Sequence, residues 1–364
     1  MSIVDYFSSS YAEARNKFLI SSNAAGAAMT SYEHPFEKGP SGESLFIYVA
    51  WLGDRNAQRV VTIGCGTHGI EGFAGSASQT QWLNSHTEED LPPNTAIAFF
   101  HAHNPWGFAH YLRFTEHNVD LNRNFVDFNK APPLNCVYPI VHKLIAFPDW
   151  SDDALNECFE KLSDLRELIG EQCYSNGFNG GQYTHPDGIY FGGTGIEWSN
   201  TAFRQAVGDH LTAARSAAFV DLHTGIGPED GHVFLCFHET GTPAYERARA
   251  WWGERAVNRD GVTHKAVARY QGLLVDAFVD MLPETQTTAV VVEFGTRPRP
   301  VMQRASMAAR HLFCNKEISP ALSEKLMREV REAFNPSEPA WRAGVLAQSK
   351  DLIDHALAGI ATTS

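Results

Sequence analysis

The chain has 364 residues and is acidic, with 29 lysine and arginine residues against 42 aspartate and glutamate residues and a net charge of −13. This balance argues against a nucleic-acid or anionic-membrane partner, because such a chain lacks the broad basic surface that phosphate groups require. Hydrophobic residues make up 43% of the sequence and aromatic residues 12%, which is enough for a packed core and excludes a disordered chain.

In chain order, the sequence predicts short apolar strands that alternate with longer segments of helical period. The first expected element is a helix over residues 2–20, which lacks the basic start and uninterrupted apolar run of a secretory signal. The expected strands cover residues 45–51, 59–66, 95–102, 217–223, 232–237 and 289–295. The other expected helices cover residues 72–84, 151–172, 199–215, 243–258, 303–314, 320–334 and 345–358. Near-continuous apolar strands indicate a mainly parallel sheet with helices on both faces.

An irregular stretch over residues 176–199, rich in glycine and aromatic residues, interrupts this alternation. Loops of this length inside a compact domain are usually functional or mobile, so the stretch is a candidate lid or pocket wall. The alternative is a surface loop that its aromatic side chains merely anchor. We expect a single domain over residues 1–364, with an irregular insertion at about residues 128–200.

His68 and Glu71 lie in a glycine-bearing turn directly after the predicted strand at residues 59–66. The carboxyl edge of an α/β sheet is where such folds usually bind ligands. A catalytic zinc site typically takes three protein ligands, and His223 is the best third candidate because it also follows an apolar strand. The three side chains are therefore predicted to hold one metal ion. The alternative for His68 is a turn histidine without a metal.

Two further carboxylates lie on predicted strands near this edge. Asp221 precedes His223 by two residues and so points to the same strand face, where it either supports a metal ligand or caps the turn. Glu293 lies in the most apolar strand, where an unpaired charge is costly. We predict that Glu293 is a base that takes a proton from metal-bound water. The alternative is an ion pair with Arg297 or Arg299.

A polar stretch after the strand at residues 95–102 contains Arg113, Asn122 and Arg123. Guanidinium groups suit bidentate recognition of carboxylates. One arginine is predicted to polarise a scissile carbonyl, while the other, with Asn122, holds a substrate carboxylate. Surface arginines without such a role are the alternative.

Five motifs in this order resemble the zinc carboxypeptidase clan, which includes the succinylglutamate desuccinylase and aspartoacylase branch. They are GTHGIEGFAGS, the NP pair at residues 104–105, RFTEHNVDLNRNF, DLHTG and VVVEFG, and they span about residues 62–295. Other stretches, among them QYTHPDGIYFGG, resemble an uncharacterised branch of the clan. The resemblance implies a three-layer α/β/α fold with a mixed, mainly parallel sheet.

The resemblance also implies a role for each candidate residue. One zinc ion would be bound by His68, Glu71 and His223. Arg113 would polarise the carbonyl, Asn122 and Arg123 would hold the substrate carboxylate, and Glu293 would act as general base and acid. Tyr270 occupies a place comparable to the mobile tyrosine of the digestive carboxypeptidases.

These observations together predict a zinc-dependent hydrolase that cleaves an amide bond next to a free carboxylate, as a carboxypeptidase or an N-acyl amino acid deacylase. Two alternatives remain open, a non-haem iron oxygenase with the same two-histidine, one-carboxylate set and a binding protein that has lost catalysis. Scattered cysteines and the absence of a membrane-length apolar run indicate a cytoplasmic protein. Hydrogen-bonded structural roles are expected for the other prominent histidines, His101, His103, His185 and His238, with His185 also a candidate pocket residue.

Overall fold

A mixed β-sheet forms the centre of the molecule in the computed structural model, which describes residues 3–147, 150–253 and 268–363. Within these residues the sheet has seven strands in the order β1-β2-β4-β3-β5-β7-β6. The strands are β1 (Ala28–Lys38), β2 (Ser44–Leu52), β3 (Arg59–Cys65), β4 (Thr95–His101), β5 (Ser216–Thr224), β6 (His232–Leu235) and β7 (Gln286–Phe294).

Parallel pairing is confined to the central strands β4, β3, β5 and β7, while β1, β2 and β6 pair antiparallel with their neighbours. The central strands are almost completely buried, as their near-continuous apolar sequences predicted. The expected α/β fold with a mixed sheet is therefore confirmed. Because β3, β5 and β7 run in the same direction, their carboxyl ends meet at one edge of the sheet.

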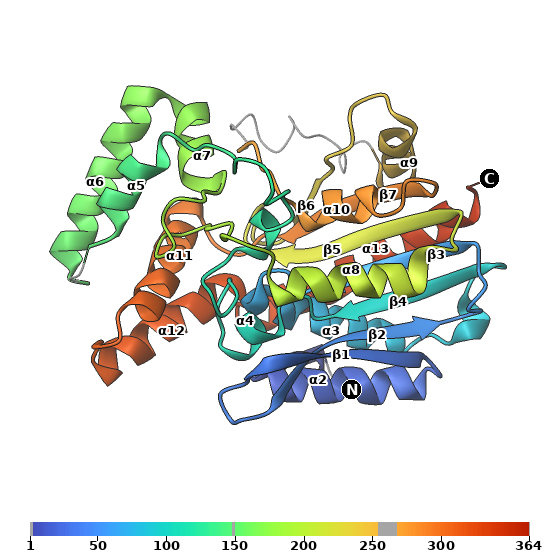
Figure 1. The fold of residues 1–364 in the computed structure, drawn as a ribbon. Coiled ribbons are helices and arrows are strands. Elements are labelled where there is room, and N and C mark those ends of the chain that lie inside the picture. Colours follow the sequence, from blue (N-terminus) through green and yellow to red (C-terminus); the bar gives the residue numbers. More distant parts are fainter. Residues whose placement is uncertain (1–2, 148–149, 254–267, 364) are drawn as a thin grey trace.

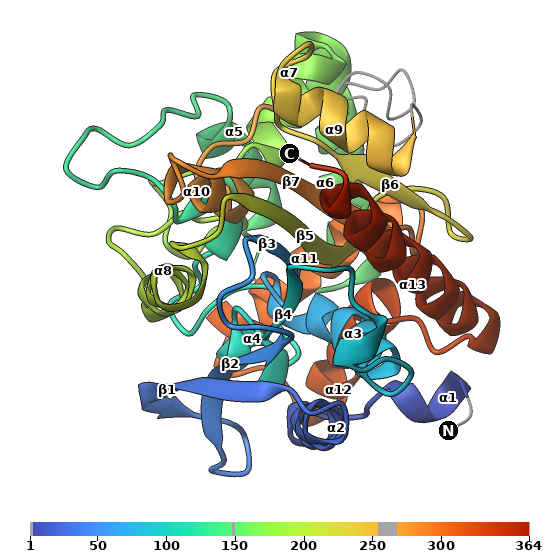
Figure 2. The same ribbon diagram turned by 90° about the vertical axis from the view of Figure 1, so that its right-hand side faces the viewer.

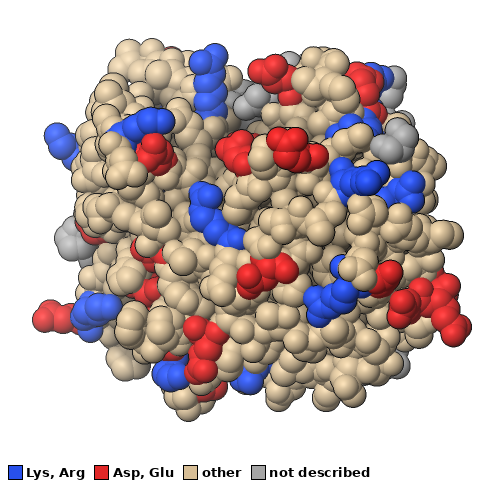
Figure 3. Space-filling view, turned by 45° about the vertical axis from the view of Figure 1, so that its right-hand side comes forward, with Lys and Arg blue, Asp and Glu red and all other residues tan. Residues whose placement is uncertain are grey.

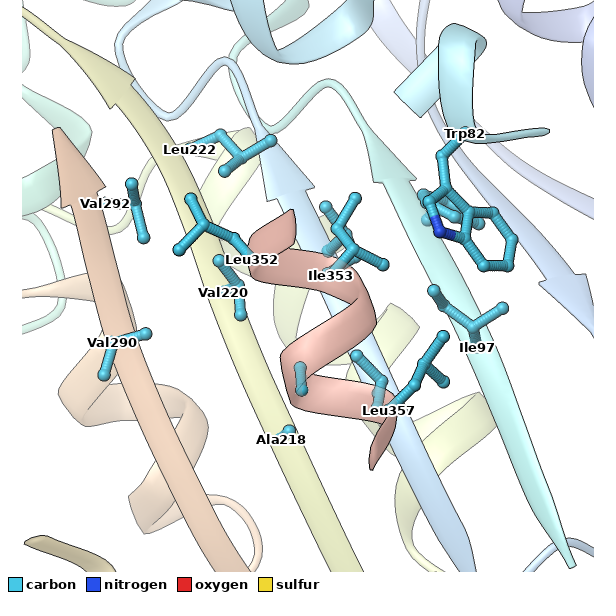
Figure 4. Close-up of a cluster of buried hydrophobic side chains, with 14 of the residues drawn as sticks. Trp82, Ile97, Ala218, Val220, Leu222, Val290, Val292, Leu352, Ile353 and Leu357 are labelled. Carbon is cyan, nitrogen blue, oxygen red and sulfur yellow. The ribbon is translucent and has the colours of Figure 1, made fainter. Parts of the chain in front are cut away.

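Helices cover both faces of the sheet (Figures 1 and 2). One face packs against α8 (Trp198–Leu211) and α10 (Leu274–Asp280), and the other packs against α3 (Gly72–Leu83), α9 (Pro243–Trp252) and α13 (Pro339–Ala361). In Figure 4, Leu352, Ile353 and Leu357 of α13 lie over alternate residues of the strands, including Val220 and Leu222. This alternation follows from the two-residue period of a strand.

A second group of helices lies beyond one end of the strands (Figure 1). It contains α5 (Tyr138–Ile145), α6 (Asp152–Ile169), α7 (Glu171–Asn179), α11 (Arg299–Cys314) and α12 (Pro320–Phe334). In α6 the buried residues Leu155, Cys158, Leu162 and Leu165 recur every three or four positions, which places them on one face. That face packs against α5 and α7 in a separate apolar cluster, which also includes buried residues of α11 and α12.

Several element boundaries differ from those predicted. The helix expected over residues 2–20 is two helices, α1 (Ile3–Tyr6) and α2 (Tyr11–Ala24), because Ser10 caps the second one and its Oγ accepts the Glu13 N–H at 3.2 Å. The helix expected over residues 151–172 ends at Gly170, which has a φ of +80°. The end of the helix expected over residues 243–258 lies outside the described residues.

Some elements were not predicted at all. These are β1, the short helices α4 (Pro105–Ala109), α5 and α10, and α7, which extends into the stretch over residues 176–199 that was expected to be irregular. β1 is an edge strand that contains Pro35 and several exposed positions, so it lacks the apolar run that marks the central strands.

Charged side chains of both signs are interspersed over the face drawn in Figure 3. Among the residues that the structure describes, no helix combines the length and apolar character needed to cross a membrane.

Candidate metal centre

The turn after β3 brings His68 and Glu71 to the carboxyl edge of the sheet. Gly66 has a φ of +69°, which lets the chain reverse where β3 ends. Gly69 begins the short 3₁₀ helix η1 (Gly69–Glu71), and a Cβ atom added there would lie 2.1 Å from the carbonyl carbon of Gly107. The glycine therefore permits direct contact between η1 and the backbone of α4.

Backbone hydrogen bonds join this turn to the segment that carries Arg113. The N–H groups of Gly69 and Ile70 donate to the carbonyl oxygens of Arg113 and Leu112, both at 3.0 Å. The position of Arg113 relative to Glu71 is thus set by main-chain contacts.

His223 and Glu293 come from neighbouring parallel strands and are register partners. Paired residues on adjacent strands point to the same face of the sheet. Both side chains therefore lie at the edge where the β3 turn presents His68 and Glu71. Asp221, two residues before His223, lies on the same face.

His68, Glu71 and His223 form the His-Glu-His cluster, one of the groups in the described residues with ligand atoms close enough to share a metal ion. The Nδ1 atom of His223 lies 3.1 Å from Nδ1 of His68 and 3.0 Å from Oε2 of Glu71. The Nδ1 atom of His68 lies 3.0 Å from Oε1 of Glu71. All three side chains are almost fully buried.

The donor set of this cluster fits a divalent metal ion. The Nε2 atom of His223 faces Asp221 Oδ2 at 2.7 Å and so carries a proton, which leaves a lone pair on Nδ1 directed at the Glu71 carboxylate. Two acceptors at 3.0 Å repel each other unless a cation or a proton lies between them. Tetrahedral zinc ligands lie roughly 3.3 Å apart, close to the separations observed here.

The electrostatics of the cluster also favour positive charge. Burial alone would lower the pKa of His223, but Asp221 and Glu71 outweigh it and raise that pKa well above its ordinary value. Burial would raise the pKa of Glu71, but His68, His223 and Arg113 hold it below its usual range. Without an ion, a proton on His223 therefore supplies the positive charge, and a bound metal ion would take the place of that proton.

Each histidine of the cluster has a carboxylate behind it. Asp221 contacts His223 and also accepts a hydrogen bond from Thr67 Oγ1 at 2.8 Å, a position that fits the predicted support of His223. Asp120 Oδ1 lies 3.1 Å from His68 Nε2. Asp120 was not singled out in the sequence, although it stands inside the DLNRNF motif. Such partners orient a ligand ring and fix its tautomer.

Glu293 lies beside the cluster without a cationic partner. Its Oε2 accepts the Ile226 N–H at 3.3 Å, and no lysine or arginine of the described chain lies within 4.0 Å of its carboxylate. Arg297 and Arg299, the partners considered for it, instead pair with Glu338 and Glu171. Burial, followed by the nearby charge of Glu71, raises the pKa of Glu293 to about 7.

Arg113 lies against the cluster and makes three contacts there. Its Nη1 donates to Glu71 Oε1 at 2.8 Å, its Nε donates to Asp120 Oδ2 at 3.2 Å, and its Nη2 lies 2.7 Å from His68 Nε2. The side chain keeps 18% of its surface exposed, whereas Glu71 and Asp120 are buried. Arg113 is therefore the cationic group on the open side of the cluster.

Arg123 and Asn122 lie on the short helix η3 (Leu121–Arg123), next to Asp120. Two guanidinium N–H groups of Arg123 donate to backbone carbonyls, at 2.7 and 2.8 Å. Its Nε is buried without a partner, and none of its described neighbours offers a carboxylate within 4.0 Å. Asn122 Oδ1 accepts the Leu274 N–H at 2.9 Å, which orients its amide nitrogen away from α10.

Tyrosines surround Arg123. The ring of Tyr270 lies 4.7 Å from its guanidinium carbon, so the structure brings this predicted residue to the site. Tyr190, in the glycine-rich stretch over residues 176–199, lies 5.2 Å from the guanidinium carbon of Arg113 and 6.0 Å from that of Arg123. The Phe191 carbonyl accepts the Asp120 N–H at 2.7 Å. The stretch therefore forms one wall of the site.

The other histidines lie outside this cluster. His101 Nε2 hydrogen-bonds with Ser76 Oγ at 2.8 Å, and His103 Nδ1 lies 2.8 Å from Thr67 Oγ1. His238 Nε2 accepts the Ala289 N–H at 2.9 Å. His185 packs against His142 and Tyr138 in the neighbouring group of helices.

Comparison with family models matches residues 7–348 to a family described as "Protein of unknown function (DUF2817)". Comparison with curated proteins gives no match. Among solved structures, the chain is similar to a carboxypeptidase A from Helicoverpa armigera, with a TM-score of 0.53, 14% sequence identity, and coverage of 99% of this chain and 75% of that one. At this identity the likeness shows the fold, and it confirms the expected carboxypeptidase-like architecture.

Two further similar structures are bovine thrombin-activatable fibrinolysis inhibitor in complex with tick carboxypeptidase inhibitor and a succinylglutamate desuccinylase from Chromobacterium violaceum. The first has a TM-score of 0.47 and 11% identity, and the match covers 95% of this chain and 100% of that one. The second has a TM-score of 0.37 and 14% identity, and the match covers 88% of this chain and 74% of that one.

Proposed function

Because this chain belongs to the DUF2817 family, whose function is unknown, we propose its activity from its own residues, as zinc-dependent hydrolysis of an amide bond next to a free carboxylate. The substrate is a short peptide or an N-acyl amino acid. The observation that carries the proposal is the convergence of His68, Glu71 and His223 within hydrogen-bond distance of one another, with Glu293 beside them.

His68, Glu71 and His223 would hold the ion. When bound in such a set, zinc lowers the pKa of a coordinated water and polarises a carbonyl oxygen. Glu293 takes the proton from the attacking water and later delivers it to the leaving nitrogen. Its pKa of about 7 suits both steps, because a group that titrates near the working pH can accept and release a proton.

Arg113 stabilises the negative charge that develops on the carbonyl oxygen. Its guanidinium already lies at the open side of the cluster, and its pKa is raised by Asp120 and Glu71 in spite of burial, so it stays charged. Donors directed at such a charge usually make the largest single contribution to catalysis.

Arg123 and Asn122 bind the substrate carboxylate. A guanidinium has five N–H donors, and the hydrogen bonds of Arg123 to the carbonyl oxygens of Asn122 and Asn179 use two of them. A positive charge that is buried without a described carboxylate partner favours an anionic ligand. Tyr270 packs over the same guanidinium and so borders the carboxylate subsite.

The substitution Glu293→Gln tests the proposal. It keeps the size of the side chain but removes the base, so zinc content should stay at the wild-type level while turnover of a pooled library of short peptides and N-acyl amino acids falls by at least about 100-fold. Mass spectrometry of the library detects cleavage, and elemental analysis measures the metal. Glu229→Gln, at an exposed position, is the matched control and should keep activity.

Two outcomes would overturn the proposal. The first is a Glu293→Gln protein that cleaves the same substrates at the wild-type rate. The second is protein purified without added metal that contains iron and turns over only with oxygen, because that result would favour the oxygenase chemistry of the same ligand set.

A further inference from the structure

A second group of ligand-type side chains, the Glu-His-Glu cluster, contains Glu116, His117 and Glu197. One ligand atom from each residue lies within 4.8 Å of the others. Glu116 and His117 lie in the turn between Arg113 and Asp120, and Glu197 directly precedes α8. We propose that this cluster is a second site for a divalent transition-metal ion, separate from the His-Glu-His cluster.

The first support is that two buried carboxylates lack a lysine or arginine partner among the described residues. The side chains of Glu116 and Glu197 are each only 9% exposed. Within the described ranges, neither carboxylate has a lysine or arginine nitrogen within 4.0 Å. Carboxylates so deeply buried need a compensating cation, because the loss of hydration is otherwise costly.

His34 does not supply this charge. Its Nδ1 accepts the backbone N–H of Glu37 at 3.0 Å, so that nitrogen carries no proton. The proton of the ring lies on Nε2, which donates to Glu116 Oε1 at 3.0 Å. Within the Glu-His-Glu cluster, the nitrogen-bearing side chain is that of His117.

The second support is the way in which the carboxylates are held. The ring of His34 orients Glu116, and Thr115 Oγ1 donates to Glu197 Oε2 at 2.8 Å. The Nδ1 atom of His117 lies 3.1 Å from Glu197 Oε2. In metal sites the ligand side chains are typically oriented by hydrogen bonds to neighbouring groups that do not bind the metal.

The chemistry of the cluster selects the kind of ion. An imidazole with two carboxylates suits Zn²⁺, Mn²⁺ or Co²⁺, whereas Mg²⁺ and Ca²⁺ prefer oxygen ligands only. The side chain of His117 is 70% exposed, which leaves one side of the cluster open to water ligands.

An ion at this site would join two separate segments, the turn that carries Glu116 and His117 and the start of α8. The turn is closed by the Thr115 N–H, which donates to the Val119 carbonyl at 2.9 Å. Glu197 connects this turn to the start of α8, and His34 connects it to β1. The same turn begins after Arg113 and ends before Asp120. An ion bound to the Glu-His-Glu cluster would therefore restrict the motion of the residues next to the candidate metal centre.

The test is a count of bound metal in the full chain. Chelator-stripped protein is dialysed against increasing free Zn²⁺ or Mn²⁺, and metal per chain is measured by mass spectrometry. His117→Ala and Glu197→Gln should each bind one ion fewer than the wild type at saturation. His223→Ala should also lose one ion, but from the other cluster. His355→Ala, which removes an exposed histidine outside both clusters, should lose none.

Thermal unfolding gives a second measurement that does not depend on the first site. In the His223→Ala protein, added Zn²⁺ should raise the melting temperature, because an ion that binds only the folded state stabilises it. The double variant His117→Ala/His223→Ala should lose this rise. Equal metal counts in wild type and His117→Ala, or an equal loss in His355→Ala, would overturn the proposal and leave a proton on His117 as the compensating charge.

Discussion

At the residue scale, the behaviour of the candidate metal centre depends on the carboxylates behind its histidines. Asp221 and Asp120 contact the Nε2 atoms of His223 and His68, so the two Nδ1 atoms face each other across the Glu71 carboxylate. A negative charge behind an imidazole makes its free nitrogen a stronger ligand.

Asp221→Asn should therefore weaken zinc binding by about 10–100-fold, because the amide keeps the contact but not the charge. Competition with a chromophoric chelator measures the affinity. Asp209→Asn is the control and should leave the affinity unchanged. It alters the acceptor of a hydrogen bond from the Tyr32 hydroxyl, far from the site. Zinc binding of wild-type strength in Asp221→Asn would contradict a supporting role for Asp221.

The positions of residues at the end of a strand could be predicted from the sequence. His68, His223 and Glu293 each follow or end an apolar run, and parallel strands bring such positions together. Asp120 and Tyr190 were missed because their contacts come from irregular chain. Their approach to the site depends on one β-bridge between Val119 and Phe191, which leaves no periodic signal.

At the scale of elements, the contact between η1 and α4 determines where Glu71 lies. The absence of a Cβ atom at Gly69 lets the two backbones touch, and the space there is bounded by main-chain atoms of Gly107 and Phe108. Backbone atoms cannot rotate away as a side chain can. The turn that carries two of the predicted ligands is thus held by main-chain packing.

Gly69→Ala should lower the free energy of unfolding by about 1–3 kcal/mol and weaken metal binding, because the new methyl group forces η1 away from α4. Urea unfolding of the metal-free protein measures the first effect. Gly208→Ala is the matched control, since Gly208 lies in α8 with nothing within 4 Å of an added Cβ. That change should be neutral or stabilising by up to about 1 kcal/mol. Equal stability of the two variants would argue against a tight contact at Gly69.

Element prediction succeeded where burial is complete and failed where it is partial. The central strands, buried on both faces, were found within a few residues of their bounds. β1 alternates between exposed and buried positions and so carries a weaker signal. The breaks at Ser10 and Gly170 depend on one cap and one positive φ, which hydrophobic periodicity does not report.

At the scale of the whole molecule, burial of neutral histidines should make stability depend on pH. Burial lowers the pKa of His101 to about 3 and that of His238 to about 4. Both rings are neutral when folded, whereas in the unfolded chain they take up protons near pH 6.5. Because only the unfolded state takes up these protons, the free energy of unfolding falls as the pH decreases from about 6.5 to 4.

His238→Gln should reduce this dependence, because glutamine can still accept the Ala289 N–H but does not titrate. Between pH 7 and pH 4.5 the wild type should lose on the order of 2 kcal/mol more than the variant. Urea unfolding with a chelator present measures the difference without a contribution from metal binding. Parallel pH profiles for the two proteins would contradict a neutral His238 in the folded state.

The sequence distance within the His-Glu-His cluster has a consequence for the newly made protein. His68 and His223 are 155 positions apart, and Glu293 follows still later. At roughly 5–20 residues per second, a ribosome needs roughly 8–30 s to travel from the first histidine to the second. A growing chain thus has only two of the three ligands during that time. Hydrolytic competence would then begin only after the Glu293 strand has emerged and joined the sheet.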